Sequence, residues 1–178
     1  MTASSEVSPL LAITVLGRDR PGIIADVTGV LASLGGNLED TTMTLLRGHF
    51  AMTLIVACPQ PPAEIDRALR PMTSDAGLIV SVREVPPEAS VASGSPYLLT
   101  VHGADRPGIV SAVTRVCADV GANITDLATR LSDDLYLLIA EVDVPTTVDV
   151  DALTDRLFSV ARELGVEASL RPVEADVL

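Results

Sequence analysis

The chain has 178 residues, a formal net charge of −12 and a hydrophobic fraction of 48%, with a mean hydropathy of +0.42. This composition indicates a globular protein with one domain or two small ones, and its acidity argues against direct binding of nucleic acid. The chain contains no lysine, which excludes a Schiff-base lysine and the lysine of a Walker-type phosphate loop. It also has neither the basic start of a secretory signal peptide nor an apolar run as long as a membrane span. We therefore expect a cytoplasmic protein.

The first expected elements are a strand and an amphipathic helix. A near-continuous aliphatic run over residues 10–16 predicts a buried strand, and apolar residues at helical spacing over residues 23–34 predict the helix. Pro21 fits the first turn of this helix, and Asp19 is placed to cap its N-terminus. Gly35 fits the left-handed position that follows a helix end.

Two further strands, a helix and a last strand follow. The strands are predicted at residues 37–46 and 50–57, with a hairpin turn at Arg47–Gly48 between them. Apolar residues over 65–72 share one helix face, and residues 78–85 read as a strand. The order is βαββαβ, which is the ferredoxin-like arrangement.

The same pattern then occurs a second time. Residues 14–23 match residues 100–109 at an offset of 86, and the match continues without gaps to Asp40 and Asp126. Roughly half of these positions are identical, which indicates that one structural unit is built twice. In the second copy the elements are predicted at residues 97–101, 109–120, 123–131, 135–144, 150–164 and 166–173.

The repeat predicts the domain organisation. We expect one domain at residues 8–85 and another at 96–174, joined by a linker at 86–95 that is rich in proline, serine and alanine. Each is an α+β domain with an antiparallel sheet and its helices on one face. Each copy has about eighty residues, near the lower size for a self-sufficient core, so we expect the two copies to pack against each other, against a second chain in a homodimer, or both.

The loop between the first strand and the first helix is the main candidate site. A helix N-terminus offers free N–H groups and a partial positive charge to a carboxylate. Gly22 leaves room for a ligand to approach the backbone, and Asp19 could receive an ammonium group. Asn37 is expected at the same end of the domain, where its amide could bind either group. Together these residues suggest an amino-acid pocket.

Other interpretations stay open on the residues alone. Asp-x-Pro-Gly also makes a good strand-to-helix turn without any ligand. His49 and His102 stand alone and indicate neither a metal site nor a catalytic triad. Cys117 is expected to be a buried thiol, while Cys58 could be reactive. No set of nucleophile, base and orienting residue is recognisable, so neither a cofactor nor an enzymatic activity is expected.

The repeated motifs resemble those of the ACT domain, a small regulatory module that typically binds amino acids. The resemblance rests on Asp-Arg-Pro-Gly-Ile after the first strand and on Gly-x-Asn before the second, and it covers both copies. This variety is also found in formyltetrahydrofolate deformylases and nitrogen-sensing uridylyltransferases. The segment 37–43, followed by Gly48-His49-Phe50, is most similar to the glycine cleavage system transcriptional repressor family, whose members are two ACT domains and little else.

The resemblance implies a function and a set of contacts. ACT domains pair side by side, and effectors bind where the loop of one domain meets the start of the second strand, often of its neighbour. In the repressor family, glycine is the signal and control runs through contact with a DNA-binding activator. The second copy departs from the motif, with Thr125 in place of Glu39. By position, the implied ligand-binding residues are Asp19, Arg20, Pro21, Gly22, Ile23, Asn37, Asp105, Arg106, Pro107, Gly108, Ile109 and Asn123.

Three hypotheses follow. The first is a non-enzymatic regulator that senses an amino acid such as glycine and acts by protein contact, without binding nucleic acid or a membrane. The second is a scaffold in which the repeats serve only dimerisation. The third is a small hydrolase of acylphosphatase type, in which Arg20 and Asn37 would form the catalytic pair. An acidic Asp19 beside a phosphate argues against the third.

Overall fold

The computed structural model describes residues 8–75, 77–86 and 94–173. The chain divides into two compact units, Met1–Ser90 (unit 1) and Val91–Leu178 (unit 2). Most of the predicted linker, residues 87–93, lies outside the described residues. Each unit is described by itself below.

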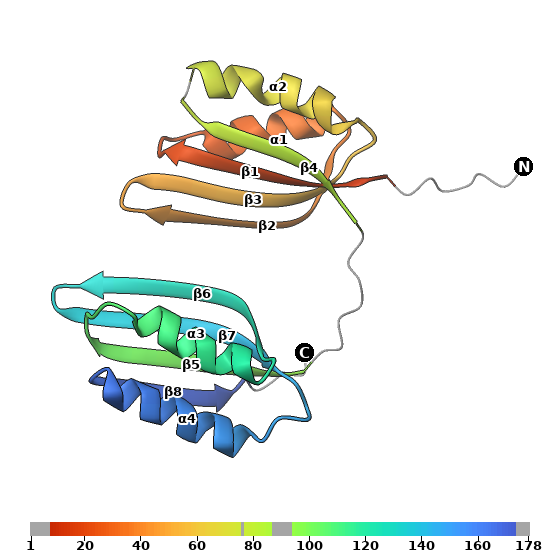
Figure 1. Cartoon of the computed structure of the whole chain (residues 1–178). Coiled ribbons are helices and arrows are strands. Elements are labelled where there is room, and N and C mark those ends of the chain that lie inside the picture. The colour runs from red at the N-terminus through yellow and green to blue at the C-terminus, as the bar shows by residue number, and fades with distance from the viewer. Residues whose placement is uncertain (1–7, 76, 87–93, 174–178) are drawn as a thin grey trace, which may run out of the picture. The chain divides into compact units, whose positions relative to one another are not determined.

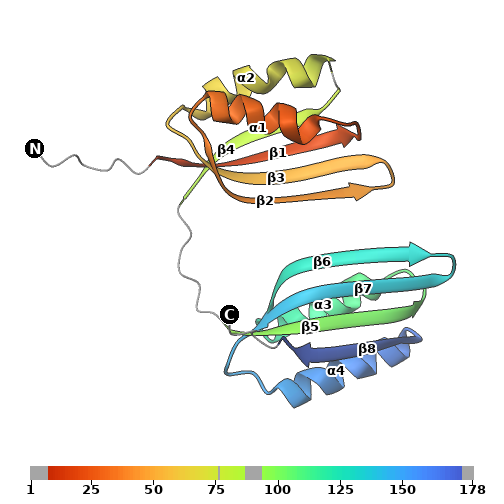
Figure 2. The same cartoon turned by 180° about the vertical axis from the view of Figure 1, so that it is seen from behind.

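Unit 1 is a four-stranded antiparallel sheet with two helices (Figure 1). The strand order is β2-β3-β1-β4, and both helices cover one face of the sheet, as the view from behind also shows (Figure 2). The elements are β1 (Leu10–Arg18), α1 (Ile23–Ser33), β2 (Asn37–Leu46), β3 (His49–Ala57), α2 (Pro62–Asp75) and β4 (Ile79–Val85).

Unit 2 repeats this topology, with strand order β6-β7-β5-β8. Its elements are β5 (Ser95–Ala104), α3 (Ile109–Asp119), β6 (Asn123–Ser132), β7 (Leu135–Val144), α4 (Val150–Glu163) and β8 (Val166–Pro172). The predicted α+β class and the βαββαβ order are therefore confirmed in both copies. No helix in the described ranges combines the length and the hydropathy that crossing a bilayer requires.

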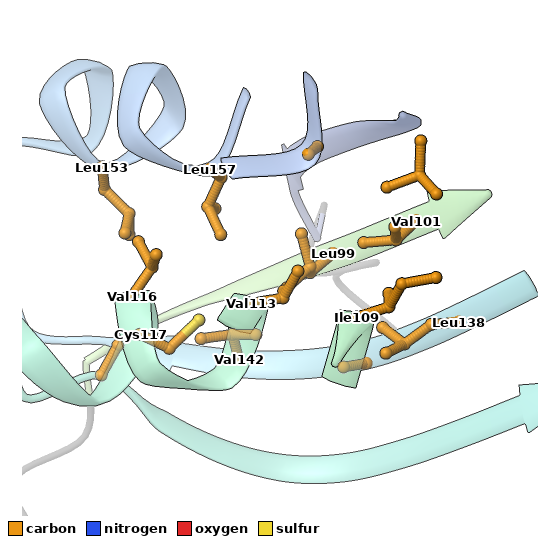
Figure 3. Close-up of a cluster of buried hydrophobic side chains, with 14 of the residues drawn as sticks. Leu99, Val101, Ile109, Val113, Val116, Cys117, Leu138, Val142, Leu153 and Leu157 are labelled. Carbon is orange, nitrogen blue, oxygen red and sulfur yellow. The ribbon is translucent and has the colours of Figure 1, made fainter. Parts of the chain in front are cut away.

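Each unit has its own aliphatic core between sheet and helices. In β1, alternate residues Leu11, Ile13 and Val15 are buried against α1 and α2, as strand geometry requires. In unit 2 the core side chains of α3 and α4 meet those of β5 and β7 (Figure 3). The labelled residues are Leu99, Val101, Ile109, Val113, Val116, Cys117, Leu138, Val142, Leu153 and Leu157.

The first helix of each unit ends as the sequence predicts. Gly35 has a φ of 78° and donates its N–H to the Ala32 carbonyl, while the Gly36 N–H bonds to the Leu31 carbonyl at 2.9 Å. This is the Schellman motif, which requires a left-handed residue directly after the helix. Gly121, with a φ of 74°, ends α3 in the same way.

The β2–β3 connection is the tight hairpin turn that the sequence predicts. Arg47 and Gly48 have φ values of 49° and 81°, so the two-residue turn has the twist that a tight hairpin needs. The β2–β3 register shifts between Leu38 and Asp40, which leaves Glu39 in a β-bulge. Unit 2 has the same bulge at Thr125.

Candidate functional site

The loop between β1 and α1 presents the start of a helix, but not with the capping that the sequence suggests. The N-cap residue is Gly22, with a φ of 91°, and no side chain caps the helix. Asp19 as N-cap and Pro21 in the first helical turn are therefore wrong, because both residues precede the cap. The left-handed backbone, which glycine adopts at little cost, sets the start of α1. In unit 2, Gly108 caps α3 with a φ of 96°, so Asp105 and Pro107 are corrected likewise.

This cap leaves backbone donors at the helix start. The first helical hydrogen bond runs from the Asp26 N–H to the Gly22 carbonyl, at 2.8 Å. The N–H groups of residues 23–25 precede that bond, and they are the ones that a helix N-terminus offers to an anion. The Asp19 N–H bonds to the Gly48 carbonyl at 3.1 Å, which holds the loop against the β2–β3 hairpin.

The arginines of the two loops have different surroundings. The Arg20 guanidinium forms an ion pair with Asp26 at 3.0 Å and also donates to the Pro21 carbonyl at 3.1 Å. The position of Asp26 is Ala112 in unit 2, where this pair cannot form. Arg106 instead lies over the end of α4, where a Cβ on Gly165 would be 3.4 Å from its guanidinium carbon.

The loop of unit 1 borders a hollow of about 480 Å³. The hollow is lined by residues 19–25 together with Met43 of β2 and Phe50 of β3. Met43 is 45% exposed, whereas Phe50 is buried. Neither residue is predicted from the loop motif as a lining group. The available signal was strand alternation, which puts them on the helix-facing side of the sheet.

The corresponding positions in unit 2 are more polar. Tyr136 stands in place of Phe50, and Thr129 in place of Met43. Both lie on the helix-facing side, in diagonal positions of the β6–β7 pair. Partial burial raises the pKa of the Tyr136 hydroxyl, a hydrogen bond with Thr129 lowers it, and the charge of Asp105 raises it further. The two loops therefore offer chemically different surroundings.

Asn37 lies far from the loop of its own unit, which corrects the expectation that the two share one end. Leu10 at the start of β1 and Asn37 are both opposite Ala57 of β3, whereas Arg18 at the end of β1 is opposite His49. Eight residues of strand separate these ends, or about 26 Å.

Asn123 is placed in the same way, because it pairs with Asp143 while the end of β5, at Ala104, pairs with Leu135. Each unit thus keeps its loop residues together and its asparagine at the other end of the sheet. Arg20 and Asn37 accordingly do not form an acylphosphatase-like pair within one unit.

The remaining candidate residues have ordinary structural roles. Cys58 is fully buried, with its Sγ 3.7 Å from the Leu34 carbonyl oxygen. Cys117 is also buried, and burial raises the pKa of its thiol. His102 lies 3.7 Å from Glu167 on the surface. Within the described ranges, no three His, Cys, Asp or Glu side chains are grouped so that they could hold a metal ion.

The sequence profile of the ACT domain family matches residues 9–83 and again residues 95–171. The chain belongs to the ACT domain family. Its resemblance to that family, predicted from the loop motifs, is thereby confirmed, and both matches carry the fold described above.

Individual proteins resemble the chain over different lengths. A UPF0237 protein of Methanopyrus kandleri is 50% identical over 44 residues, which are 25% of this chain and 49% of that protein. The chain thus spans about half the length of that relative. The glycine cleavage system transcriptional repressor of Escherichia coli is 22% identical over 97% of this chain and 94% of its own length. The crystal structure of an unknown protein from Galdieria sulphuraria superposes with a TM-score of 0.79 at 31% identity, covering 93% of this chain and 99% of that one.

Proposed function

We propose that this ACT-domain protein is a non-enzymatic regulator that senses a small amino acid, such as glycine, at its Asp-Arg-Pro-Gly loops. The observation that carries the proposal is the start of α1 and α3. Both helices begin at a left-handed glycine without a side-chain cap, so their first N–H groups are available to a ligand carboxylate. Asp19 and Asp105 would bind the ammonium group.

Asn37 and Asn123 could contact the ligand only if a second ACT domain supplies the loop. Because each lies about 26 Å from the loop of its own unit, it could complete a site only at a loop that another ACT domain supplies. A ligand held between two domains binds one of their arrangements better than the others, and so shifts the population towards that arrangement. This is a physical route from amino-acid binding to regulation.

The remaining parts of the proposal concern location and partners. We propose that the protein is a cytoplasmic homodimer that acts by contact with another protein, for example a DNA-binding regulator. Its net charge of −12 supports indirect action, because a phosphate backbone would repel it.

Isothermal titration calorimetry against the twenty amino acids tests the proposal. We expect at least one amino acid to release or absorb heat on binding, and Asp19→Asn to weaken that binding roughly tenfold or more at the first loop, since the ammonium group loses its charged partner. Asp105→Asn is the equivalent change at the second loop.

Asp66→Asn is the matched control, because Asp66 is an exposed carboxylate on α2 that pairs with Arg70 away from the loop. This variant should bind as the unchanged protein does. If folded protein gave no heat with any amino acid, the sensing function would be wrong. If Asp66→Asn weakened binding as much as Asp19→Asn, the loop would not be the site.

A further inference from the structure

The sheet of unit 1 has an open face, which is the side turned away from α1 and α2 (Figure 1). Strand pairing arranges its residues in rows that run across β2, β3, β1 and β4 in that order. The rows are Asn37–Ala57–Leu10–Val85, Asp40–Ile55–Ala12–Arg83, Thr42–Thr53–Thr14–Ser81 and Thr44–Ala51–Leu16–Ile79.

This open face combines exposed aliphatic residues with hydroxyl side chains, and its few charges balance. Leu16 is 46% exposed and Ile79 is 67% exposed, although both are large aliphatic residues. Within the four rows the charged residues are Asp40 and Arg83. Glu39 in the bulge lines a hollow with Leu10, Asp40, Ile55 and Val85 of the same face, and Arg18 lies one row beyond Leu16, opposite His49. Large aliphatic residues exposed together on one face are typical of interaction surfaces. The near-neutral face suits a partner that is also uncharged there.

The two central strands alternate in side-chain size. In three of the rows, one of the central residues is small and the other is large. The small residue lies on β3 in two of these rows and on β1 in the third. The pairs are Ala57 with Leu10, Ile55 with Ala12, and Ala51 with Leu16. A hollow of about 350 Å³ lies over this side of the sheet, lined by Ala51, Leu16, Ile79 and several threonines.

The two charges within these rows are also placed symmetrically about the centre of the sheet. Asp40 on β2 and Arg83 on β4 stand at opposite ends of one row, with Ile55 and Ala12 between them. A two-fold axis that runs along the strands, between β3 and β1, exchanges the two halves of every row. It would bring each small central residue over a large one, and Asp40 over Arg83.

We propose that the open face of unit 1 binds the same face of a second copy of this chain, sheet against sheet, about such a two-fold axis. Sheets that pack face to face keep their strands within about 30° of each other, so the central rows stay matched. A face of four strands and about eight residues has roughly 500 Å², so the pair buries about 1,000 Å² in total. That area is at the lower limit for a specific interface.

The open face of unit 2 lacks this self-complementarity. Its row Asp126–Glu141–Leu98–Arg171 keeps the two charged ends but has Glu141 on the central strand β7. The neighbouring central residue Asp143 is a second carboxylate. Pairing this face with itself would bury Glu141 against Leu98 without a partner charge, which is costly. The matching row of unit 2 therefore serves as a control.

Charge reversal with sedimentation equilibrium of the full-length protein tests this proposal. We expect a dimer that Asp40→Arg weakens roughly tenfold or more, because Arg would then face Arg83 at two places in each pair. Arg83→Asp should do the same. The double variant Asp40→Arg/Arg83→Asp restores the opposite charges across the axis and should restore the dimer.

The equivalent changes in unit 2, Asp126→Arg and Arg171→Asp, should leave the mass unchanged, and circular dichroism checks that each variant is folded. Three results would overturn the proposal: a monomeric unchanged protein, single variants that stay dimeric, or a double variant that stays dissociated. Since no ligand takes part, this test is separate from that of amino-acid sensing.

Discussion

Cys117 shows how one residue can differ between the copies while its role is kept. It occupies in α3 the position that Leu31 occupies in α1, and both side chains are buried in the core of their unit. The predicted burial of Cys117 is confirmed, because the residue lies on the apolar stripe of its helix. Unlike leucine, however, a thiol can ionise, and burial opposes ionisation.

The stability of the protein should therefore fall at alkaline pH. Burial raises the pKa of Cys117 above its ordinary value of 9.0. Below that value the thiol is neutral in both states. As the pH rises through it, the unfolded chain loses a proton that the folded chain retains, so the free energy of unfolding decreases. Urea unfolding at a series of pH values measures this slope.

Two variants show which residues cause the decrease in the free energy of unfolding at alkaline pH. Cys117→Ala should flatten the slope, while lowering stability at neutral pH by about 1–2 kcal/mol through lost packing. Tyr136→Phe should flatten it at higher pH, because the pKa of Tyr136 is raised as well. An unchanged slope in both variants would mean that other groups cause the alkaline loss.

At the scale of elements, α1 and α3 begin differently from α4. α1 and α3 start at a left-handed glycine without a side-chain cap, whereas Asp149 caps α4 by accepting N–H bonds from Asp151 and Ala152 at 3.1 Å. The sequence assigned the capping role to Asp19 and missed Asp149. An aspartate shortly before a helical stripe is not sufficient evidence for a cap, because the backbone between them decides where the helix begins.

Removing the real cap should destabilise unit 2. We expect Asp149→Ala to lower the free energy of unfolding by about 1 kcal/mol, because two N–H groups at the start of α4 lose their acceptor. Asp149→Asn should lose much less, since its side-chain oxygen can still accept. Chemical denaturation followed by circular dichroism compares the two, and equal losses would show that the charge matters more than the hydrogen bonds.

The order and type of the elements could be predicted because the apolar periods, Gly35 and Gly121 as helix ends, and the Arg47–Gly48 turn all indicate the same fold. The lining of the loop could not be predicted so directly. Met43 lines the hollow at the loop of unit 1 because β2 pairs with β3 along the edge of the sheet. Which residues of β2 and β3 are neighbours depends on the strand register. The bulge at Glu39 shifts this register by one residue, and the sequence spacing does not reveal that shift.

At the scale of the whole chain, the position of Asn37 has the same kind of explanation. β1 and β2 both run antiparallel to β3, so they run in the same direction. The end of β1 and the start of β2 must then lie at opposite ends of the sheet. The sequence suggested that Asn37 lies at the same end of the domain as the loop, whereas the strand directions place it at the opposite end.

Two separate cores predict that each unit responds to its own mutations. Val27 and Val113 are equivalent, fully buried residues of α1 and α3. We expect Val27→Ala to cost about 2 kcal/mol and to speed amide hydrogen exchange in β1–β4 of the full-length protein, with little change in β5–β8.

Val113→Ala should give the reverse pattern of exchange, so each variant is the control for the other. Faster exchange in both units after either single change would show that the chain unfolds as one cooperative body.

The repeated topology also makes the order of synthesis important. The two copies offer similar strands to each other, so a strand of one copy could insert into the sheet of the other while the chain folds. Both strands that pair with β1, namely β3 and β4, have been synthesised once the chain reaches Val85. Unit 1 can therefore close its sheet on the ribosome while β5 is still to be made. Vectorial synthesis thus separates the copies in time, a protection that is lost when the whole chain refolds from denaturant.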